Sequence, residues 1–290
     1  MTDPRGDMAG GRVEVTFWGV RGSIACPGPG AAAFGGNTSC VEITCGGGAD
    51  GKRGHIILDA GTGIRPLGNA LAASGTGVDA DILLSHTHLD HLVGLPFFAP
   101  AYCLNSKLRL WAGHLADDRK IHDVLCMMMA DPLFPIPMDL MVAAKSLEDF
   151  KAGDRFELSC GASVRTAALN HPGGATGYRI ERDGKAIAYV TDTEHVAGTH
   201  DAAILALIDG ADLFIYDTTY TEDEYSDREG WGHSTWQEGA ALAEIAGVDT
   251  FVPFHHDPSH DDNFMAQIEA EAKDRFENTV VAREGLTLTL

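Results

Sequence analysis

The residues best suited to chemistry lie in one short run, 86–91, with the sequence His-Thr-His-Leu-Asp-His. It places three imidazoles and one carboxylate within six positions. Imidazole nitrogen and carboxylate oxygen are the ligands that zinc and similar divalent ions prefer. A polar loop with hydrogen-bonded histidines is the alternative interpretation, but such a cluster has no stabilising purpose without a metal. The run therefore predicts a metal site with enough donors for two ions.

Short apolar runs precede this motif and several other acids and histidines. They are rich in branched or aromatic residues and are bounded by glycine or polar residues, which is typical of strands. Because loops at strand ends carry reactive groups on a rigid sheet, we expect the following polar residues to be functional. The predicted strands are 55–58 before Asp59, 81–85 before His86, 164–169 before His171, 186–190 before Asp192, 213–216 before Asp217 and 251–254 before His255.

Helices and a hairpin complete the predicted elements. Helical patterns cover 64–73, 234–246 and 263–276, and Ser234 with Gln237 forms a capping-box pattern at the start of the second. Gly247 is the residue type that usually ends such a helix. Strands at 178–182 and 185–190, joined by Asp183-Gly184, predict a tight hairpin. Hairpins mixed with helix-linked strands indicate an α/β or α+β sandwich.

The charge balance of the chain bears on its partners. The 290 residues include 21 Lys and Arg against 42 Asp and Glu, a net charge of −21. A field of this sign repels polyanions, and nucleic-acid binding needs basic contacts that no run supplies. Salt screens the field beyond ~8 Å, so a small anionic substrate remains compatible. We therefore expect a small-molecule anionic substrate and no tRNA or duplex nucleic acid.

The location of the protein is expected to be cytoplasmic. Residues 1–11 contain no apolar signal-peptide core and are expected to be flexible. The most apolar uncharged run, 92–106, contains two prolines and is shorter than the ~18 residues of a membrane helix. The six cysteines show no CxxC pattern, which favours reduced thiols. No membrane association is expected.

The metal motif and the order of the later residues resemble the metallo-β-lactamase superfamily, and within it the ribonuclease Z-like and cyclic-nucleotide phosphodiesterase-like branch. The resemblance begins at the run 16–19, Thr-Phe-Trp-Gly, and extends to the His255 region. It implies a single αββα sandwich domain over 1–290, with two packed mixed β-sheets and helices on the outer faces. It also implies that Asp59 braces the histidine loop rather than binding metal. Carried over to this chain, the ligands are His86, His88 and His171 for the first ion, Asp90, His91 and His255 for the second, and Asp192 bridging both; His256 and His260 compete with His255 for the last position.

The segment Gly232-His233-Ser234-Thr235 points to the branch, because it resembles the ribonuclease Z segment in which a catalytic histidine opens a helix. A glutamate supports that histidine in the family, and Asp217 stands at the aligned position here. The resemblance thus implies His233, Asp217 and Asp90 as catalytic residues. Di-iron oxidoreductase relatives carry a glutamate at the position of His88, so this residue favours a hydrolase.

The expected function is a binuclear metal-dependent phosphodiesterase that acts on small, including cyclic, phosphodiesters through a hydroxide shared by two ions ~3.5–4 Å apart. The ions are expected to be Zn²⁺, with Mn²⁺ or Fe as alternatives. Ribonuclease Z proper inserts a tRNA-gripping arm between the residues aligned with His171 and Asp192, which are only 21 positions apart here. A hydrolase of a lactone, thioester or other carbonyl substrate on the same scaffold is the main alternative, and a structural metal protein is the third.

Two further segments have open interpretations. The run Arg21-Gly22-Ser23 resembles loops common to this branch and lies either near the site or in a tight glycine turn. The apolar stretch 114–142 is expected to pack in the core, with a substrate lid or a homodimer surface as alternatives.

Overall fold

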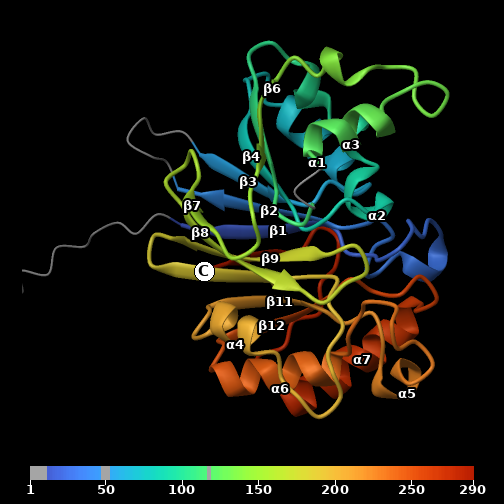
Figure 1. The fold of residues 1–290 in the computed structure, drawn as a ribbon. Coiled ribbons are helices and arrows are strands. Elements are labelled where there is room, and N and C mark those ends of the chain that lie inside the picture. The colour runs from blue at the N-terminus through green and yellow to red at the C-terminus, as the bar shows by residue number, and fades with distance from the viewer. Residues whose placement is uncertain (1–11, 47–52, 116–118) are drawn as a thin grey trace, which may run out of the picture.

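Two β-sheets pack face to face in the computed structural model, and helices cover both outer faces (Figure 1). The structure describes residues 12–46, 53–115 and 119–290, so the expectation of a flexible segment at 1–11 lies outside the described residues. Both sheets contain parallel and antiparallel pairs. This arrangement confirms the predicted αββα sandwich.

The first sheet has seven strands in the order β13-β1-β2-β3-β4-β5-β6. Its pairs from β13 to β3 are antiparallel, and those from β3 to β6 are parallel. The parallel half carries the metal motif, which follows the end of β4. The strands are β1 (Glu14–Gly19), β2 (Cys40–Cys45), β3 (Gly54–Leu58), β4 (Asp79–Leu84), β5 (Lys107–Ala112), β6 (Ala144–Asp149) and β13 (Thr287–Thr289).

The second sheet has six strands in the order β12-β11-β10-β9-β8-β7. Strands β9 and β10 form the predicted hairpin, and Asp183 and Gly184 in its turn both have positive φ, 52° and 78°. Asp-Gly suits such a turn because both positions require the left-handed region. The strands are β7 (Arg155–Glu157), β8 (Ser163–Leu169), β9 (Ala175–Arg182), β10 (Lys185–Val190), β11 (Leu213–Asp217) and β12 (Thr250–Phe254).

The helices divide between the outer faces of the two sheets (Figure 1). Helices α1 and α3 lie against the first sheet, and α4, α6 and α7 lie on the side of the second. Short 3₁₀ turns occur at Pro29–Ala31, Leu95–Phe97, Ala99–Tyr102 and Met138–Leu140. The helices are α1 (Ile64–Ala72), α2 (Leu89–Leu92), α3 (Ile121–Met128), α4 (Ala202–Ile208), α5 (Glu222–Tyr225), α6 (Trp236–Ala246) and α7 (Asp262–Arg275).

Helix α6 begins later than predicted. Its N-cap is Thr235, whose side chain accepts a hydrogen bond from the Glu238 amide at 3.2 Å. The hydroxyl of Ser234, the predicted cap, instead accepts from the Tyr216 hydroxyl at 2.9 Å. Gly247 ends the helix in the left-handed region with φ 62°, as expected.

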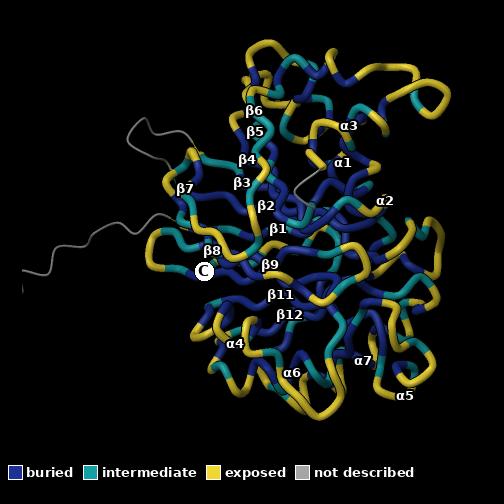
Figure 2. Tube along the Cα trace, in the orientation of Figure 1, coloured by how far each residue is buried: buried dark blue, intermediate teal, exposed yellow. Residues whose placement is uncertain are grey.

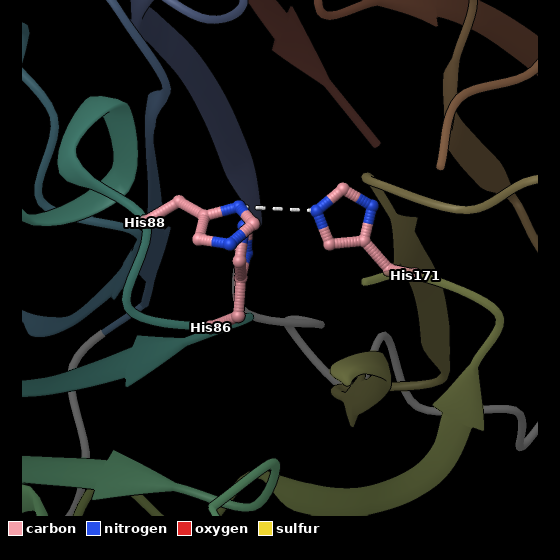
Figure 3. A group of neighbouring side chains, drawn as sticks. All are labelled: His86, His88 and His171. Atoms are coloured by element: carbon pink, nitrogen blue, oxygen red, sulfur yellow. Dashed lines mark hydrogen bonds between the residues drawn. The ribbon is translucent and has the colours of Figure 1, made fainter. Parts of the chain in front are cut away.

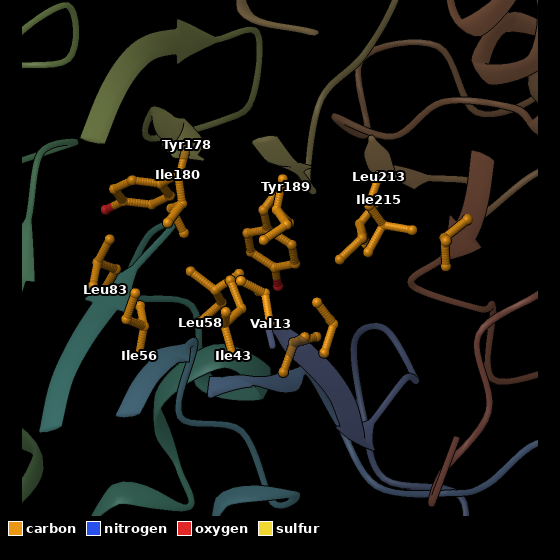
Figure 4. Packing of buried hydrophobic residues seen from close by; sticks show 14 of the residues in the cluster. Val13, Ile43, Ile56, Leu58, Leu83, Tyr178, Ile180, Tyr189, Leu213 and Ile215 are labelled. Atoms are coloured by element: carbon orange, nitrogen blue, oxygen red, sulfur yellow. The ribbon is translucent and has the colours of Figure 1, made fainter. Parts of the chain in front are cut away.

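The main core lies between the sheets (Figures 2 and 4). Ile43, Ile56 and Leu58 of the first sheet face Tyr178 and Ile215 of the second, and all are fully buried. Burial of each such side chain contributes about 1.5–3 kcal/mol. The packing holds the strand ends of the two sheets against each other.

The apolar stretch 114–142 has a mixed character over its described residues. Ile121, Leu125 and Met129 pack into the core beneath the first sheet, which confirms the expectation for this part. Leu133 and Leu140 are 76% and 54% exposed. Among the described residues, no helix combines the length and apolarity needed to cross a bilayer.

Candidate metal centre

The loops that follow β4, β8, β10 and β12 meet at one edge of the sandwich. They bring together all seven side chains expected to bind metal, in two neighbouring groups. Strand β4 of the first sheet supplies four of them, and the other three come from the second sheet. The donors are His86, His88, Asp90 and His91 after β4, His171 after β8, Asp192 after β10 and His255 after β12.

The first group consists of His86, His88 and His171 (Figure 3). His171 Nε2 lies 3.1 Å from His88 Nδ1, and His86 Nε2 is buried without a hydrogen-bond partner among the described residues. His171 Nδ1 donates to the carbonyl of Gly232 at 2.8 Å. His86 Nδ1 lies 3.0 Å from Ser85 Oγ. The Ser85 hydroxyl donates its own hydrogen to Asp59, so it accepts from His86. Both histidines therefore turn an unprotonated Nε2 toward the group.

The second group consists of Asp90, His91, Asp192 and His255. The Nε2 atoms of His91 and His255 lie 3.2 Å apart. Asp90 Oδ2 and Asp192 Oδ2 each lie 3.1 Å from His91 Nε2 and 3.3 Å from His255 Nε2. His91 Nδ1 donates to Asp59 at 2.8 Å. Nε2 is thus the nitrogen of His91 that faces the carboxylates.

Asp192 lies between the two groups. Its Oδ1 is 3.8 Å from both His86 Nε2 and His171 Nε2, while its Oδ2 faces the second group. The carboxylate therefore offers one oxygen to each side, which is the arrangement expected of a bridging ligand.

The donor set fits divalent cations. In a tetrahedron with metal–ligand distances of about 2.0–2.1 Å, neighbouring ligand atoms are about 3.3 Å apart, and the second group has this spacing. Asp90 and Asp192 pack around the same two ring nitrogens, and their carboxylates repel one another unless a positive charge lies among them. Burial alone would raise the pKa of Asp192, but the surrounding histidines hold it well below its usual value. The nitrogen and oxygen donors suit zinc, manganese or iron.

Asp59 braces the histidine loop, as expected. Its carboxylate accepts hydrogen bonds from the Ser85 amide, the Ser85 hydroxyl, His91 and the Tyr189 hydroxyl at 2.7–2.8 Å. Asp59 is fully buried at the end of β3. These contacts fix the ring of His91 through the nitrogen that does not face the site.

Several site residues have a strained backbone. Asp59, Asp192, His255 and Ser23 have φ values of 55–64°, a region that non-glycine residues adopt at a cost. Among the described residues only Asp183, in the hairpin turn, shares this property. The strain is thus concentrated where loops leave the sheets to present their side chains.

His233 lies beside both groups and pairs with Asp217, as the sequence predicted. Its Nδ1 donates to Asp217 Oδ2 at 2.8 Å, and its ring stacks on His255 with centroids 5.0 Å apart. Burial lowers the pKa of His233, but the Asp217 carboxylate outweighs this effect and raises it to about 9. The shorter aspartate therefore reaches the histidine, and the imidazolium form is favoured.

The structure separates His255 from its two sequence rivals. His256 Nε2 donates to the carbonyl of Ala282 at 2.8 Å, and His260 Nε2 lies 2.9 Å from a Glu224 carboxylate oxygen. Neither belongs to the donor groups. His255 Nδ1 instead donates to Thr219 Oγ1 at 3.0 Å, which leaves Nε2 facing the site.

The run Arg21-Gly22-Ser23 lies at the site. The Ser23 amide donates to Asp90 Oδ2 at 2.8 Å. A Cβ at Gly22 would lie 2.4 Å from a ring carbon of His255, so only glycine fits there. Sequence reasoning missed the roles of Ser23 and Thr219, because one contributes a backbone amide and the other acts through His255.

Comparison with known proteins places these observations in a family. The model described as beta-lactamase superfamily domain matches residues 55–256. A protein named Ribonuclease Z from Bradyrhizobium sp. (strain ORS 278) is 30% identical, over 83% of this chain and 91% of that protein. The metallo-beta-lactamase fold protein YhfI from Bacillus subtilis superposes with a TM-score of 0.70 at 17% identity, covering 97% of this chain and 100% of that one. Human tRNase Z, short form, superposes with a TM-score of 0.64 at 17% identity, covering 95% and 98%.

The expectation that excludes tRNA as a partner is wrong. The matched relatives include several named Ribonuclease Z, and one structural neighbour is a tRNase Z, over almost the full length of the chains. The argument from net charge fails because the −21 is a property of the whole molecule. Fields beyond ~8 Å are screened, so local charges decide what approaches the site. The short spacing between His171 and Asp192, which the hairpin β9–β10 spans, does not exclude tRNA either.

The metal motif, the αββα sandwich and these matches lead to one conclusion: the chain belongs to the metallo-β-lactamase superfamily of metal-dependent hydrolases, in its ribonuclease Z-like branch.

Proposed function

We propose that the protein is a binuclear metal-dependent phosphodiesterase whose substrates include small phosphodiesters, cyclic ones among them. The observation that carries this proposal is the His233–Asp217 pair beside two donor groups that share Asp192. Kinship with proteins named Ribonuclease Z supports a phosphodiester as the bond that is cleaved. We also propose that the chain forms a single catalytic domain.

The proposed metal ligands are those of the two groups. The chain would hold one ion through His86, His88 and His171 and another through Asp90, His91 and His255, with Asp192 between them. Divalent ions at such positions polarise the phosphoryl oxygen and activate water for attack. Zn²⁺ is the proposed metal, since imidazole nitrogen and carboxylate oxygen are among its usual ligands.

His233 is the proposed acid of the reaction. Its Nδ1 is engaged by Asp217, so Nε2 is the nitrogen that can pass a proton to the leaving oxygen. Asp217 is held in turn by the Thr193 amide and by the amide and hydroxyl of Thr219. An alkoxide leaving group needs this proton, and the raised pKa of His233 keeps it available at neutral pH.

A cytoplasmic location is also proposed. The six cysteines all lie within the described residues, and none of them forms a disulfide in the structure. Free thiols are typical of reducing compartments.

A substrate panel tests the proposal. The purified, Zn²⁺-loaded protein is assayed with cyclic nucleotides, a bis-aryl phosphate, a precursor tRNA, a lactone and a thioester. We expect hydrolysis of phosphodiesters, and loss of that activity in Asp90→Ala. Turnover of the lactone or thioester with no cleavage of any phosphodiester would overturn the proposal in favour of a carbonyl hydrolase.

A further inference from the structure

Glu194 connects three loops that border the site. It lies two residues beyond Asp192, in the loop that follows β10. Its amide donates to the carbonyl of Asn170 at 2.8 Å, and Asn170 Nδ2 donates to the carbonyl of Glu194 at 2.9 Å. Asn170 directly precedes His171. The backbone of Glu194 is therefore tied to the loop that presents a proposed metal ligand.

The carboxylate of Glu194 holds a glycine turn at residues 230–232. Its Oε2 accepts from the amides of Gly230 and Gly232 at 2.8 and 2.7 Å, and its Oε1 accepts from Gly230 at 2.9 Å. Hydrogen bonds to an ionised carboxylate are stronger than those between neutral groups. Both glycines have positive φ, 88° and 86°, and Trp231 between them is 62% exposed. Two residues of the turn are exposed, and besides the bond from the Trp231 amide to the Arg228 carbonyl at 3.1 Å, its amides are held by this carboxylate.

The glycine turn in turn contacts the histidines of the site. The carbonyl of Gly232 accepts from His171 Nδ1 at 2.8 Å. A Cβ at Gly232 would lie 2.3 Å from the same nitrogen, which shows how closely the backbone approaches the ring. His233 is the next residue in the chain. The position of one peptide thus sets both the tautomer of His171 and the placement of His233.

We propose that Glu194 is a positioning residue for the metal centre. By fixing the turn 230–232, its carboxylate keeps the Gly232 carbonyl on His171 Nδ1, so that Nε2 of His171 remains unprotonated and directed at His88 and His86. Through the same turn it holds His233 beside His255. This inference rests on the metal-site assignment made under the proposed function.

The test compares Glu194→Ala and Glu194→Gln with the control Glu229→Ala, which removes an exposed carboxylate from the same segment. Zn²⁺ affinity is measured by competition with a chromophoric chelator. Hydrogen exchange of the 226–235 segment is measured by mass spectrometry on the metal-free protein. In Glu194→Ala, we expect one of the two ions to bind about 10–100-fold more weakly, the usual effect of losing a residue that orients a ligand, and the segment to exchange faster. Glu194→Gln retains one carbonyl oxygen as acceptor and should fall between, and Glu229→Ala should match the wild type.

Wild-type Zn²⁺ affinity in Glu194→Ala, unchanged exchange of the segment, or an equal loss in Glu229→Ala would each overturn the proposal. If Glu194→Ala does not fold, the near-isosteric Glu194→Gln decides by the same two measurements. Neither readout involves turnover. The role of Glu194 can therefore be confirmed even if the protein cleaves no phosphodiester. It can also be refuted even if the protein is a phosphodiesterase.

Discussion

Individual side chains at the site are oriented through the atoms that face away from it. One ring nitrogen of His91 hydrogen-bonds to Asp59, one of His171 to the Gly232 carbonyl and one of His255 to Thr219. In each ring the other nitrogen faces the site. His233 follows the same pattern with Asp217. The outward contacts therefore determine which nitrogen is available for chemistry.

Replacement of His233 should separate the chemical role from the structural one. In His233→Ala we expect both metals to be retained and the rate on a phosphodiester with an alkoxide leaving group to fall about 10²–10⁴-fold, the worth of a positioned acid. A nitrophenolate leaving group needs little protonation, so the loss there should be much smaller. Steady-state kinetics on the two substrates measure the difference.

The exposed His122 provides a control, since His122→Ala should leave both rates unchanged. Equal losses on the two substrates in His233→Ala, or loss of metal, would show that His233 holds the site together instead.

Substitution of Gly22 should disturb the second donor group. A Cβ there would lie 2.4 Å from a ring carbon of His255, so Gly22→Ala must displace the ring or the loop. Overpacking of this kind costs about 1–3 kcal/mol. We expect fewer bound ions per chain at limiting metal, measured by elemental analysis after gel filtration.

Gly30→Ala is the matched control, because the nearest atom to its Cβ would be 3.9 Å away. Full metal content in Gly22→Ala would contradict this prediction, because it would mean that the Arg21-Gly22-Ser23 loop shifts while His255 stays in place.

At the scale of elements, the sequence predicts the strands that are short apolar runs ending in a polar residue, but it does not predict β1, β2, β5, β6, β7 or β13. The six predicted strands that precede an acid or a histidine are present with boundaries within two residues, and the predicted strand 178–182 begins three residues earlier, at Ala175. The predicted start of α6 is wrong by one cap position, because Ser234 and Thr235 are both residue types that favour the N-cap. The hydrogen bond from Tyr216 to Ser234, an element away, decides between them. The roles of Glu194 and Ser23 could not be found from the sequence. The Glu194 carboxylate accepts a hydrogen bond from the distant Gly232 amide, and the Ser23 amide donates one to the distant Asp90 carboxylate, so neither contact leaves a pattern in the sequence.

Removal of the observed cap of α6, Thr235, should lower the stability of the protein, although the sequence predicts Ser234 as the cap. Thr235→Ala loses the bond to the Glu238 amide, and we expect the free energy of unfolding to fall by about 0.5–2 kcal/mol. Urea denaturation followed by circular dichroism measures this change. Thr287→Ala removes an exposed threonine of β13 and serves as the comparison. A loss no greater than that of Thr287→Ala would place the cap elsewhere.

At the scale of the molecule, the proposed metal centre joins the two sheets. The first sheet supplies His86, His88, Asp90 and His91, and the second supplies His171, Asp192 and His255. Ions bound there would contact both halves of the sandwich. Ligands that bind only the folded state stabilise it by mass action.

The protein purified without chelator should therefore contain close to two divalent ions per chain by elemental analysis. Removal of the ions by a chelator should lower the melting temperature by several degrees, because an ion present at 100 times its dissociation constant contributes about 2.7 kcal/mol. Chelator presaturated with Zn²⁺ controls for its direct effects. A content that saturates at one ion, unchanged by Asp90→Ala, would contradict the binuclear centre.

The left-handed backbone of Asp59, Asp192 and His255 has an evolutionary consequence. Each residue is held in a conformation that glycine would adopt at a lower cost, so the backbone alone disfavours the present side chains. Asp59 offsets this cost through its hydrogen bonds to Ser85, His91 and Tyr189, and under the proposed function Asp192 and His255 would offset it by binding metal. In a lineage that had lost its need for the proposed reaction, we expect Asp192 and His255 to drift first toward glycine, and the backbone strain at these two positions to be relieved.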